Sequence, residues 1–278
     1  MKTILFPTDF SVTAENAFIY ALQIAHQLKA QLIVFHHFEM PIVSSSHAGQ
    51  PELINEVYET IEMNRFEDFK KEVSNLRKIA DKRNLSDVEM TFLMEEGLFV
   101  TNVENIVEKE SIDLIVMGTS GANNLEKKIF GTNAVRILEN VTVPVLSIPA
   151  EAHYEGVKTI GFATSLSESN KKALNIMVDF AQSINAELLC LHVMKKEDEQ
   201  FDKVLKPWIE EFGPKGVTFH TAVNEDVEQG LFFLIDKYNV DALVTVKRKM
   251  NFLEKMFKTS LSNSMNTHSY VPILTFKE

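Results

Sequence analysis

The stretch Ile112-Asp113-Leu114-Ile115-Val116-Met117-Gly118-Thr119-Ser120-Gly121 decides the fold, and Gly131-Thr132-Asn133 follows it ten residues later. Its first half is a short apolar run that contains one charged residue, Asp113, and is typical of a buried parallel strand. The residues from Asn133 to about Glu139 have the pattern of a helix. A strand, a glycine-containing loop and a helix start form a cradle for an anion. Unpaired backbone N–H groups point outward there, glycine admits a phosphate without a Cβ in the way, and Thr132 adds a hydroxyl donor.

The glycines have the spacing Gly-x2-Gly-x9-Gly-Thr, beginning at Gly118. This is neither the Walker A pattern, which continues with Gly-Lys-Ser/Thr, nor the dinucleotide-binding Gly-x-Gly-x-x-Gly. Judged from the loop alone, an ordinary strand-to-helix turn whose glycines serve only the backbone is an equal alternative. The rest of the chain has to separate these two interpretations.

The composition is that of a globular protein with one large domain or two ordinary ones, since 278 residues contain 45% hydrophobic and 24% charged residues. A net charge of −11 argues against a nucleic-acid-binding protein.

The single Cys190 lies in an apolar run, so we expect it to be a buried hydrophobic residue. The histidines lack the spacing of a metal site, so we predict no metal. The opening residues are too short an apolar run for a signal peptide, and no run of about 18 apolar residues occurs, so we expect a cytoplasmic protein without membrane contact.

Strand and helix patterns alternate along the first half of the chain. Strands are predicted at 2–6, 31–36, 88–94, 112–117 and 143–148, and helices from about 13, then at 53–83, 100–109 and 133–139. Asp9 or Ser11 is expected to cap the first helix. Such alternation demands a parallel sheet with helices on both faces, and ligands bind such sheets beyond the carboxyl ends of the strands. Asp9 and Gly118 would both lie at that edge.

The same order of strand and helix patterns occurs twice in the chain. Lys158 to Ser167 corresponds to Lys2 to Ser11 at a constant offset of 156, and later residues correspond at an offset of 128. The second half has therefore lost 28 residues (156 minus 128), which we assign to the loop and the long helix. A period this long predicts two domains of one fold. We place them at residues 1–150 and 157–278, with residues 151–156 as the linker.

In these features the chain resembles the universal stress protein family, in its tandem two-domain form. Four features carry the resemblance, which covers nearly the whole chain: Phe6-Pro7-Thr8-Asp9-Phe10-Ser11, His36, Gly118-x2-Gly121-x9-Gly131-Thr132, and Val143-Pro144-Val145. It implies two flavodoxin-like or Rossmann-like α/β sandwich domains, each with a five-stranded, mainly parallel sheet and helices on both faces. The glycine motif marks the family's ATP-binding branch, so the resemblance implies ATP as the ligand, with Mg²⁺ as an open addition.

The family's site residues transfer to this chain one by one. By resemblance, Asp9 recognises the adenosine portion, with neighbouring contacts at Pro7, Thr8 and His37. The phosphates would lie against Gly118, Gly121, Gly131, Thr132 and Asn133, and Met117 would stand beside the base or ribose. No catalytic residue is predicted. His36 has a counterpart in His192, which favours a structural hydrogen bond, whereas His37 is answered by Val193 and is the better ligand contact.

The second half departs from the glycine pattern. Ser165 answers Asp9 and would cap a helix equally well. The glycine positions are answered by Lys247 for Gly118, Met250 for Gly121 and Lys258-Thr259 for Gly131-Thr132. A Cβ at these positions would block close backbone approach, so we expect one nucleotide per chain, in the first half.

We therefore expect an adenine-nucleotide-binding stress regulator. The strands near 143–148 and 271–276 are expected to pair antiparallel within the chain as a built-in pseudo-dimer, and further homodimerisation stays open. One alternative is a slow ATP hydrolase or phosphotransferase, for which the sequence has the cradle but neither an evident base nor a Walker-type lysine. Another is a protein-interaction or small-hydrophobe-binding module.

Overall fold

We analysed a computed structural model of the chain, which describes residues 2–40, 51–119, 131–198, 200–246 and 271–277, with the backbone alone for residues 51–55. The strands are β1 Thr3–Pro7, β2 Gln31–Phe38, β3 Met90–Glu96, β4 Leu114–Gly118, β5 Val145–Ile148, β6 Thr159–Ala163, β7 Glu187–Met194, β8 Val217–Val223, β9 Ala242–Val246 and β10 Ile273–Phe276. The α-helices are α1 Val12–Leu28, α2 Pro51–Lys82, α3 Phe99–Lys109, α4 Thr132–Asn140, α5 Glu168–Ser183, α6 Phe201–Phe212 and α7 Val227–Lys237. A short 3₁₀ helix, η2, covers Gly213–Lys215.

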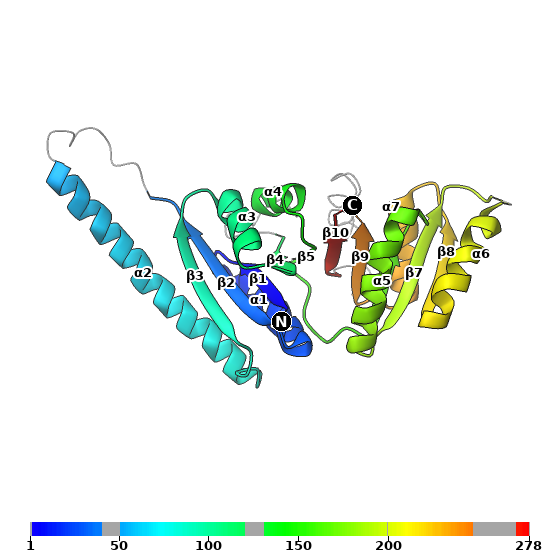
Figure 1. Cartoon of the computed structure of the whole chain (residues 1–278), viewed down its shortest axis with the longest axis horizontal. Helices are drawn as coiled ribbons and strands as arrows, with labels where there is room; N and C mark the ends of the chain where they lie inside the picture. Colours follow the sequence, from blue (N-terminus) through cyan, green and yellow to red (C-terminus); the bar gives the residue numbers. More distant parts are fainter. Residues whose placement is uncertain (1, 41–50, 120–130, 199, 247–270, 278) are drawn as a thin grey trace.

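The strands form one ten-stranded sheet in the order β3-β2-β1-β4-β5-β10-β9-β6-β7-β8 (Figure 1). The neighbours within β3-β2-β1-β4-β5 are parallel, as are those within β10-β9-β6-β7-β8. The predicted α/β fold with a mainly parallel sheet is confirmed. Strand order reverses between β1 and β4, where a doubly wound sheet places its ligand crevice.

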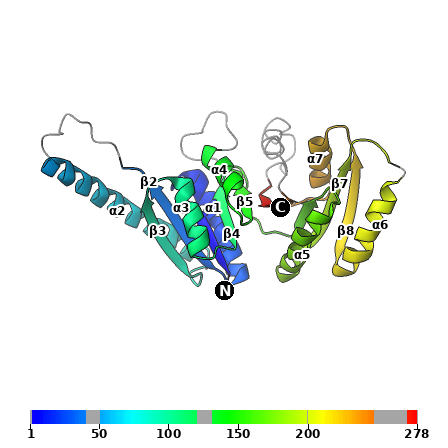
Figure 2. The ribbon, with the colours of Figure 1, turned by 45° about the horizontal axis from the view of Figure 1, so that its top comes forward.

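The two halves meet through their last strands, which lie in the middle of the sheet (Figure 2). β5 and β10 pair antiparallel, with Leu146 opposite Leu274, Ser147 opposite Ile273 and Val145 opposite Thr275. The expected antiparallel pairing of the terminal strands is therefore present within this chain.

Side chains alternate between the two faces of the sheet and build different cores on each face. On one face, a single cluster under α3, α4 and α7 contains strand residues of both halves, such as Leu5 and Leu243. On the other face there are two clusters, one under α1 and α2 and one under α5 and α6. The core is thus continuous across the seam on one face and divided on the other.

The boundaries differ from the predictions in ways that local hydrogen bonds explain. Ser11 is the N-cap of α1, and its Oγ accepts a hydrogen bond from the N–H of Ala14 at 3.2 Å. The N-cap of α5 is Ser167, so the prediction that Ser165 caps this helix was wrong. β2 continues past His36 to Phe38, because its parallel pairing with β3 extends as far as Glu96.

The long helix α2 contains 32 residues and only part of it belongs to the core. Leu76 and Ala80 are buried against the α1 cluster. Further toward its amino terminus, Val57, Met63 and Phe66 are 44%, 64% and 47% exposed. This end of the helix extends beyond the sheet (Figure 1). None of the helices in the described ranges is long and apolar enough to cross a membrane.

Candidate functional site

The turn after β1 is held by the backbone and side chain of Thr8. Its N–H donates to the carbonyl oxygen of Phe35 at 2.8 Å. Its hydroxyl oxygen accepts from the N–H of Phe10 at 3.0 Å, and its carbonyl oxygen lies 2.9 Å from Nδ1 of His36. These bonds tie the end of β1 to β2 and so fix the position of the residue that follows.

That residue is Asp9, which is exposed at the carboxyl edge of the sheet. Its Oδ1 accepts hydrogen bonds from the N–H of Ser11 at 3.0 Å and from the Ser11 hydroxyl at 2.6 Å. Asp9 therefore stabilises the turn that leads into α1, while Ser11 itself caps the helix. This arrangement answers the question, left open by the sequence, of which residue is the cap.

The glycine-containing loop leaves the sheet at Gly118, the last residue of β4. The N–H of Thr119 donates to the carbonyl oxygen of Ile148 at 3.0 Å, and the carbonyl oxygen of Thr119 accepts from the N–H of Gly131. Both ends of the loop therefore lie together at the sheet edge. Gly121 lies outside the described residues.

Helix α4 begins at Thr132 directly after this closure, one residue before the predicted start at Asn133. Its N-cap is Gly131, which has no side chain to cap the helix. The first N–H groups of an α-helix have no acceptor within the helix. The amino terminus of α4 therefore presents its partial positive charge to the space beyond the carboxyl end of β4, where an anion could bind.

Pro7, His37 and Met117 come from the adjacent strands β1, β2 and β4 and share one face of the sheet. The alternation of side chains places them there, because Leu5, Phe35 and Ile115, two residues earlier on each strand, belong to the cluster under α3 and α4. Met117 is itself in that cluster and is 5% exposed. The structure thus gathers these predicted site residues on the same face as α4.

His37 is the most informative of them. Its Nδ1 atom is buried and has no hydrogen-bond partner among the described residues. Its ring packs against Phe99, with the ring centroids 5.5 Å apart. Burial lowers the pKa of His37, as does neighbouring His36, while Glu39 opposes the shift. The ring is therefore predominantly neutral near pH 7, with a polar atom that the described chain leaves unsatisfied.

His36 faces the opposite side of the sheet and has the structural hydrogen bond that the sequence predicted. Its ring packs against Phe10, with a centroid distance of 4.7 Å, in addition to its contact with Thr8. His192 repeats this arrangement in the second half, where its Nδ1 lies 2.9 Å from the carbonyl oxygen of Thr164. A feature that occurs in both halves does not distinguish a ligand site.

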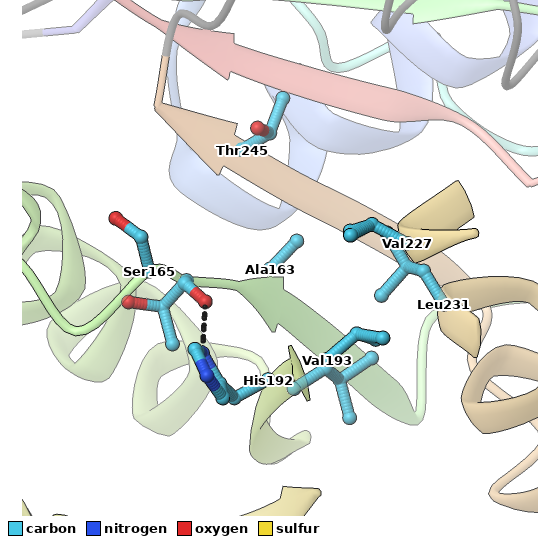
Figure 3. A pocket seen from close by; sticks show the side chains of 9 residues that line it. Ala163, Ser165, His192, Val193, Val227, Leu231 and Thr245 are labelled. Carbon is cyan, nitrogen blue, oxygen red and sulfur yellow. Dashed lines mark hydrogen bonds between the residues drawn. The ribbon is translucent and has the colours of Figure 1, made fainter. Parts of the chain in front are cut away.

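The corresponding edge of the second half contains a pocket of about 110 Å³ (Figure 3). Its lining includes Ala163, Thr164, Ser165, His192 and Val193, which correspond to Pro7, Thr8, Asp9, His36 and His37. Small-molecule pockets are usually about 300–1,000 Å³, so this pocket is small for a nucleotide. Its polar side chains are those of the turn, of His192 and of Thr245, and Val193 replaces the unsatisfied histidine.

Strand register corrects one predicted correspondence. Thr275 pairs with Thr245 and Phe276 with Val246, whereas Ser147 pairs with Met117 and Ile148 with Gly118. Val246 therefore occupies the place of Gly118, and the prediction that Lys247 does so was wrong by one residue. The consequence for the backbone is unchanged, since a Cβ still replaces the glycine. Lys247, Met250 and Lys258-Thr259 lie outside the described residues.

Two residues near the site were not among the predicted ligand contacts. Thr119 is 2% exposed and joins both ends of the loop, and Phe99 packs on His37. Phe99 follows the carboxyl end of β3, and that position was the signal that could have identified it. Within the described part of the chain, no group of three or more His, Cys, Asp or Glu residues is arranged to hold a metal ion.

Comparison with known proteins places these features in context. The family model described as "Universal stress protein family" matches residues 1–149. Universal stress protein MJ0531 of Methanocaldococcus jannaschii is 30% identical over 148 residues, which are 53% of this chain and 81% of that protein. Universal stress protein MJ0577 of the same organism is 26% identical over 159 residues, covering 53% of this chain and 94% of that protein.

A solved structure extends the likeness of fold to both halves. A universal stress protein from Archaeoglobus fulgidus DSM 4304 matches with a TM-score of 0.70 at 17% identity, covering 99% of this chain and 98% of that chain. At this identity the likeness concerns the fold, and the ligand has to be argued from the residues of this chain.

Proposed function

Because the chain belongs to the universal stress protein family, we propose that its amino-terminal half binds one adenine nucleotide, ATP, as part of a stress-response regulatory role. The proposal extends to the tandem form, in which the second half is a non-binding partner and the β5–β10 pairing makes a built-in pseudo-dimer. The protein would act by binding and not by catalysis.

The observation that carries the proposal is the buried Nδ1 of His37, which has no partner among the described residues. A buried polar atom without a hydrogen bond costs about 1–3 kcal/mol, so a ligand that supplies the bond gains affinity. An adenine ring offers both donors and acceptors along its edge, and the neighbouring Phe99 gives apolar contact. The lowered pKa of His37 favours its neutral imidazole ring. A neutral ring can hydrogen-bond to the uncharged adenine base without the cost of burying a charge.

The phosphates would be held by the loop between β4 and α4. Gly118 leaves the end of β4 without a Cβ, and the bond between Thr119 and Gly131 draws the helix start toward it. The N–H groups of Thr132 and Asn133 belong to the first turn of α4, which has no side-chain cap among the described residues, and both side chains can add hydrogen bonds. Mg²⁺ would bind through the phosphates, as it commonly does when a protein supplies few ligands.

One site per chain is expected from the differences between the halves. Val246 replaces Gly118, Val193 replaces His37 and Ser165 replaces Asp9. These replacements remove, in this order, close backbone approach, the unsatisfied ring nitrogen and the carboxylate of the proposed nucleotide site. The small pocket at that edge agrees with this expectation.

The test is to denature freshly purified protein, identify any released nucleotide by mass spectrometry and measure its amount per chain. About one ATP per chain is expected from the one-site proposal, and Gly131→Lys should lose it. Calorimetry with Mg-ATP should show that His37→Leu binds roughly two- to twelvefold more weakly, the equivalent of one neutral hydrogen bond.

His220→Leu is the matched control for this experiment, because His220 also has a pKa lowered by burial, and by Lys237, but lies on β8 in the second half. It should bind Mg-ATP as the unmodified chain does. Absence of released nucleotide together with no heat of binding would overturn the proposal. Two nucleotides per chain would overturn the account of the second half.

A further inference from the structure

The divided core on one face of the sheet follows from the strand order. Right-handed connections place α1 and α2 on one face of the first-half sheet and α3 and α4 on the other, and α1 lies mainly against β4, with fewer contacts to β1, β2 and β5. On this face α1 therefore covers most of β4 but only part of β5 and of the strand ends beside it. The second half repeats this order, so joining β5 to β10 brings two incompletely covered strand pairs together at the seam.

The result is an apolar groove of about 630 Å³ between α1 and α5. Apolar side chains dominate its walls and floor, among them Ile24, Leu28, Leu146, Leu274, Ile176 and Phe180. Leu274 contacts both core clusters of this face, so the groove lies between them. The volume is within the range of about 300–1,000 Å³ that is typical of small-molecule sites.

The groove also exposes apolar surface that a bound molecule would cover. Ile176 on α5 is 47% exposed, although α1 lies across the groove from it. Covering such surface is favourable by about 25 cal/mol per Å², so an apolar molecule of matching size gains affinity here. The groove is bounded by two helices and a sheet of the same chain, which makes it concave and not a flat patch.

The charged residues at the groove determine which charge the polar end of a bound molecule can carry. The charged residues among those that line it are Lys2, Asp113 and Asp179, which sum to −1. Burial raises the pKa of Tyr20, as do Tyr154, Asp241 and Glu155, so its hydroxyl is neutral in a field that is further negative. An anionic head group would be repelled, and a cationic or neutral one accepted.

We propose that this groove binds a small amphiphile with an apolar body and a neutral or cationic polar end. The proposal does not depend on nucleotide binding. Of the predicted nucleotide-site residues that the structure describes, none lines the groove. Occupancy of the two sites is therefore expected to be independent.

The test uses Nile red, a neutral apolar dye, in a fluorescence titration of the full chain. One dye per chain is expected, and Ile176→Lys should weaken its binding about tenfold because it places a charge in the apolar wall. Ile209→Lys is the matched control, since Ile209 on α6 is 44% exposed but does not line the groove. It should bind Nile red as the unmodified chain does.

The charge preference is tested by displacement with decyltrimethylammonium and decyl sulfate, both below their micelle-forming concentrations. The cation should displace the dye at a lower concentration than the anion of equal chain length. Asp179→Asn should reduce the ratio between the displacing concentrations of the anion and the cation several-fold, without abolishing dye binding. Saturating Mg-ATP should leave the titration unchanged, so that failure of either proposal can be recognised separately.

Three results would overturn the inference. They are equal dye binding by Ile176→Lys and Ile209→Lys, preferential displacement by decyl sulfate, or displacement of the dye by Mg-ATP. Sedimentation velocity tests whether a second copy of this chain, instead of a small amphiphile, occupies the groove. If Ile176→Lys converts a dimer to a monomer while dye binding is unchanged, the groove is an interface between copies of this chain and the proposal is wrong.

Discussion

Gly161→Ala is predicted to destabilise the second half, because β6 has no space for a Cβ at this position. A Cβ built there would lie 2.8 Å from Cδ1 of Leu191 and 3.0 Å and 3.3 Å from the two methyl groups of Val240. Both neighbours are buried, at 1% exposure each. The same position in the first half is Leu5, so a side chain of the first strand fills space there that Leu191 and Val240 occupy in the second half.

The magnitude follows from two opposing terms. Overpacking a buried site costs about 1–3 kcal/mol. Replacing glycine by alanine also removes freedom from the unfolded chain, which contributes about 0.4–1 kcal/mol in the stabilising direction. Leu191 can yield at the end of its side chain, but the β-branched Val240 is stiff at its first torsion. We therefore expect a net loss of about 1–2 kcal/mol in the free energy of unfolding.

The assay is urea unfolding followed by labelling of Cys190, which pairs with Phe162 beside Gly161, is buried in the cluster on the other face of the sheet and reports on unfolding of the second half as a whole. Gly213→Ala is the control, because its backbone is helical (φ −56°, ψ −45°) and the nearest atom to a new Cβ is 3.8 Å away. Gly213→Ala should raise the free energy of unfolding by about 0.4–1 kcal/mol.

The double variant Gly161→Ala/Val240→Ala tests the cause. Removing the methyl groups of Val240 should recover part of the stability lost in Gly161→Ala, with a coupling free energy between the two sites above about 0.5 kcal/mol. Wild-type stability of Gly161→Ala, or additive effects in the pair, would refute the reasoning.

Three further predictions concern buried polar groups. Thr275→Val should raise the free energy of unfolding by about 1 kcal/mol, measured in urea, since the hydroxyl of Thr275 is buried without a partner among the described residues. His37→Leu should flatten the pH dependence of stability. The lowered pKa of His37 means that the unfolded chain binds more protons, so stability is full above the ordinary pKa of about 6.5 and falls as the pH drops through it; equal slopes in both proteins would contradict this. Burial raises the pKa of the Cys190 thiol to about 12, so a disulfide reagent at pH 8 should label it only after unfolding, and rapid labelling of the native chain would contradict this burial.

Local patterns were sufficient for most elements of the fold. Continuous apolar runs predicted the parallel strands, and of the two cap residues that the sequence offered for α1, Asp9 and Ser11, the structure has Ser11. The recurrence of His36 as His192 predicted a structural hydrogen bond, which both residues form in the same way. These inferences depend on residues close together in sequence or on a direct repeat, so little tertiary context was needed.

Register was harder, because a shift of one residue moves every side chain of a strand to the other face. A shift of this kind set Lys247 against Gly118, although the offset of 128 for this part of the chain sets Val246 there. Pairing of Phe276 with Val246 and of Ile148 with Gly118 removes it. The strand pairing and the constant offset therefore agree that Val246 occupies the place of Gly118.

The groove between α1 and α5 could not be predicted from either half alone. Each half has a strand edge that its own helices leave partly bare, and a sequence pattern states only that Leu146 and Leu274 are apolar. Their pairing across the seam turns two ordinary edges into the floor of one concavity. The opposite face shows why this is not a general effect of joining two sheets, since α4 and α7 belong there to a single continuous core. The concavity thus arises from which face the crossover helices occupy, and any chain that joins two such sheets by these edges should have it, with an occupant set by its own charges.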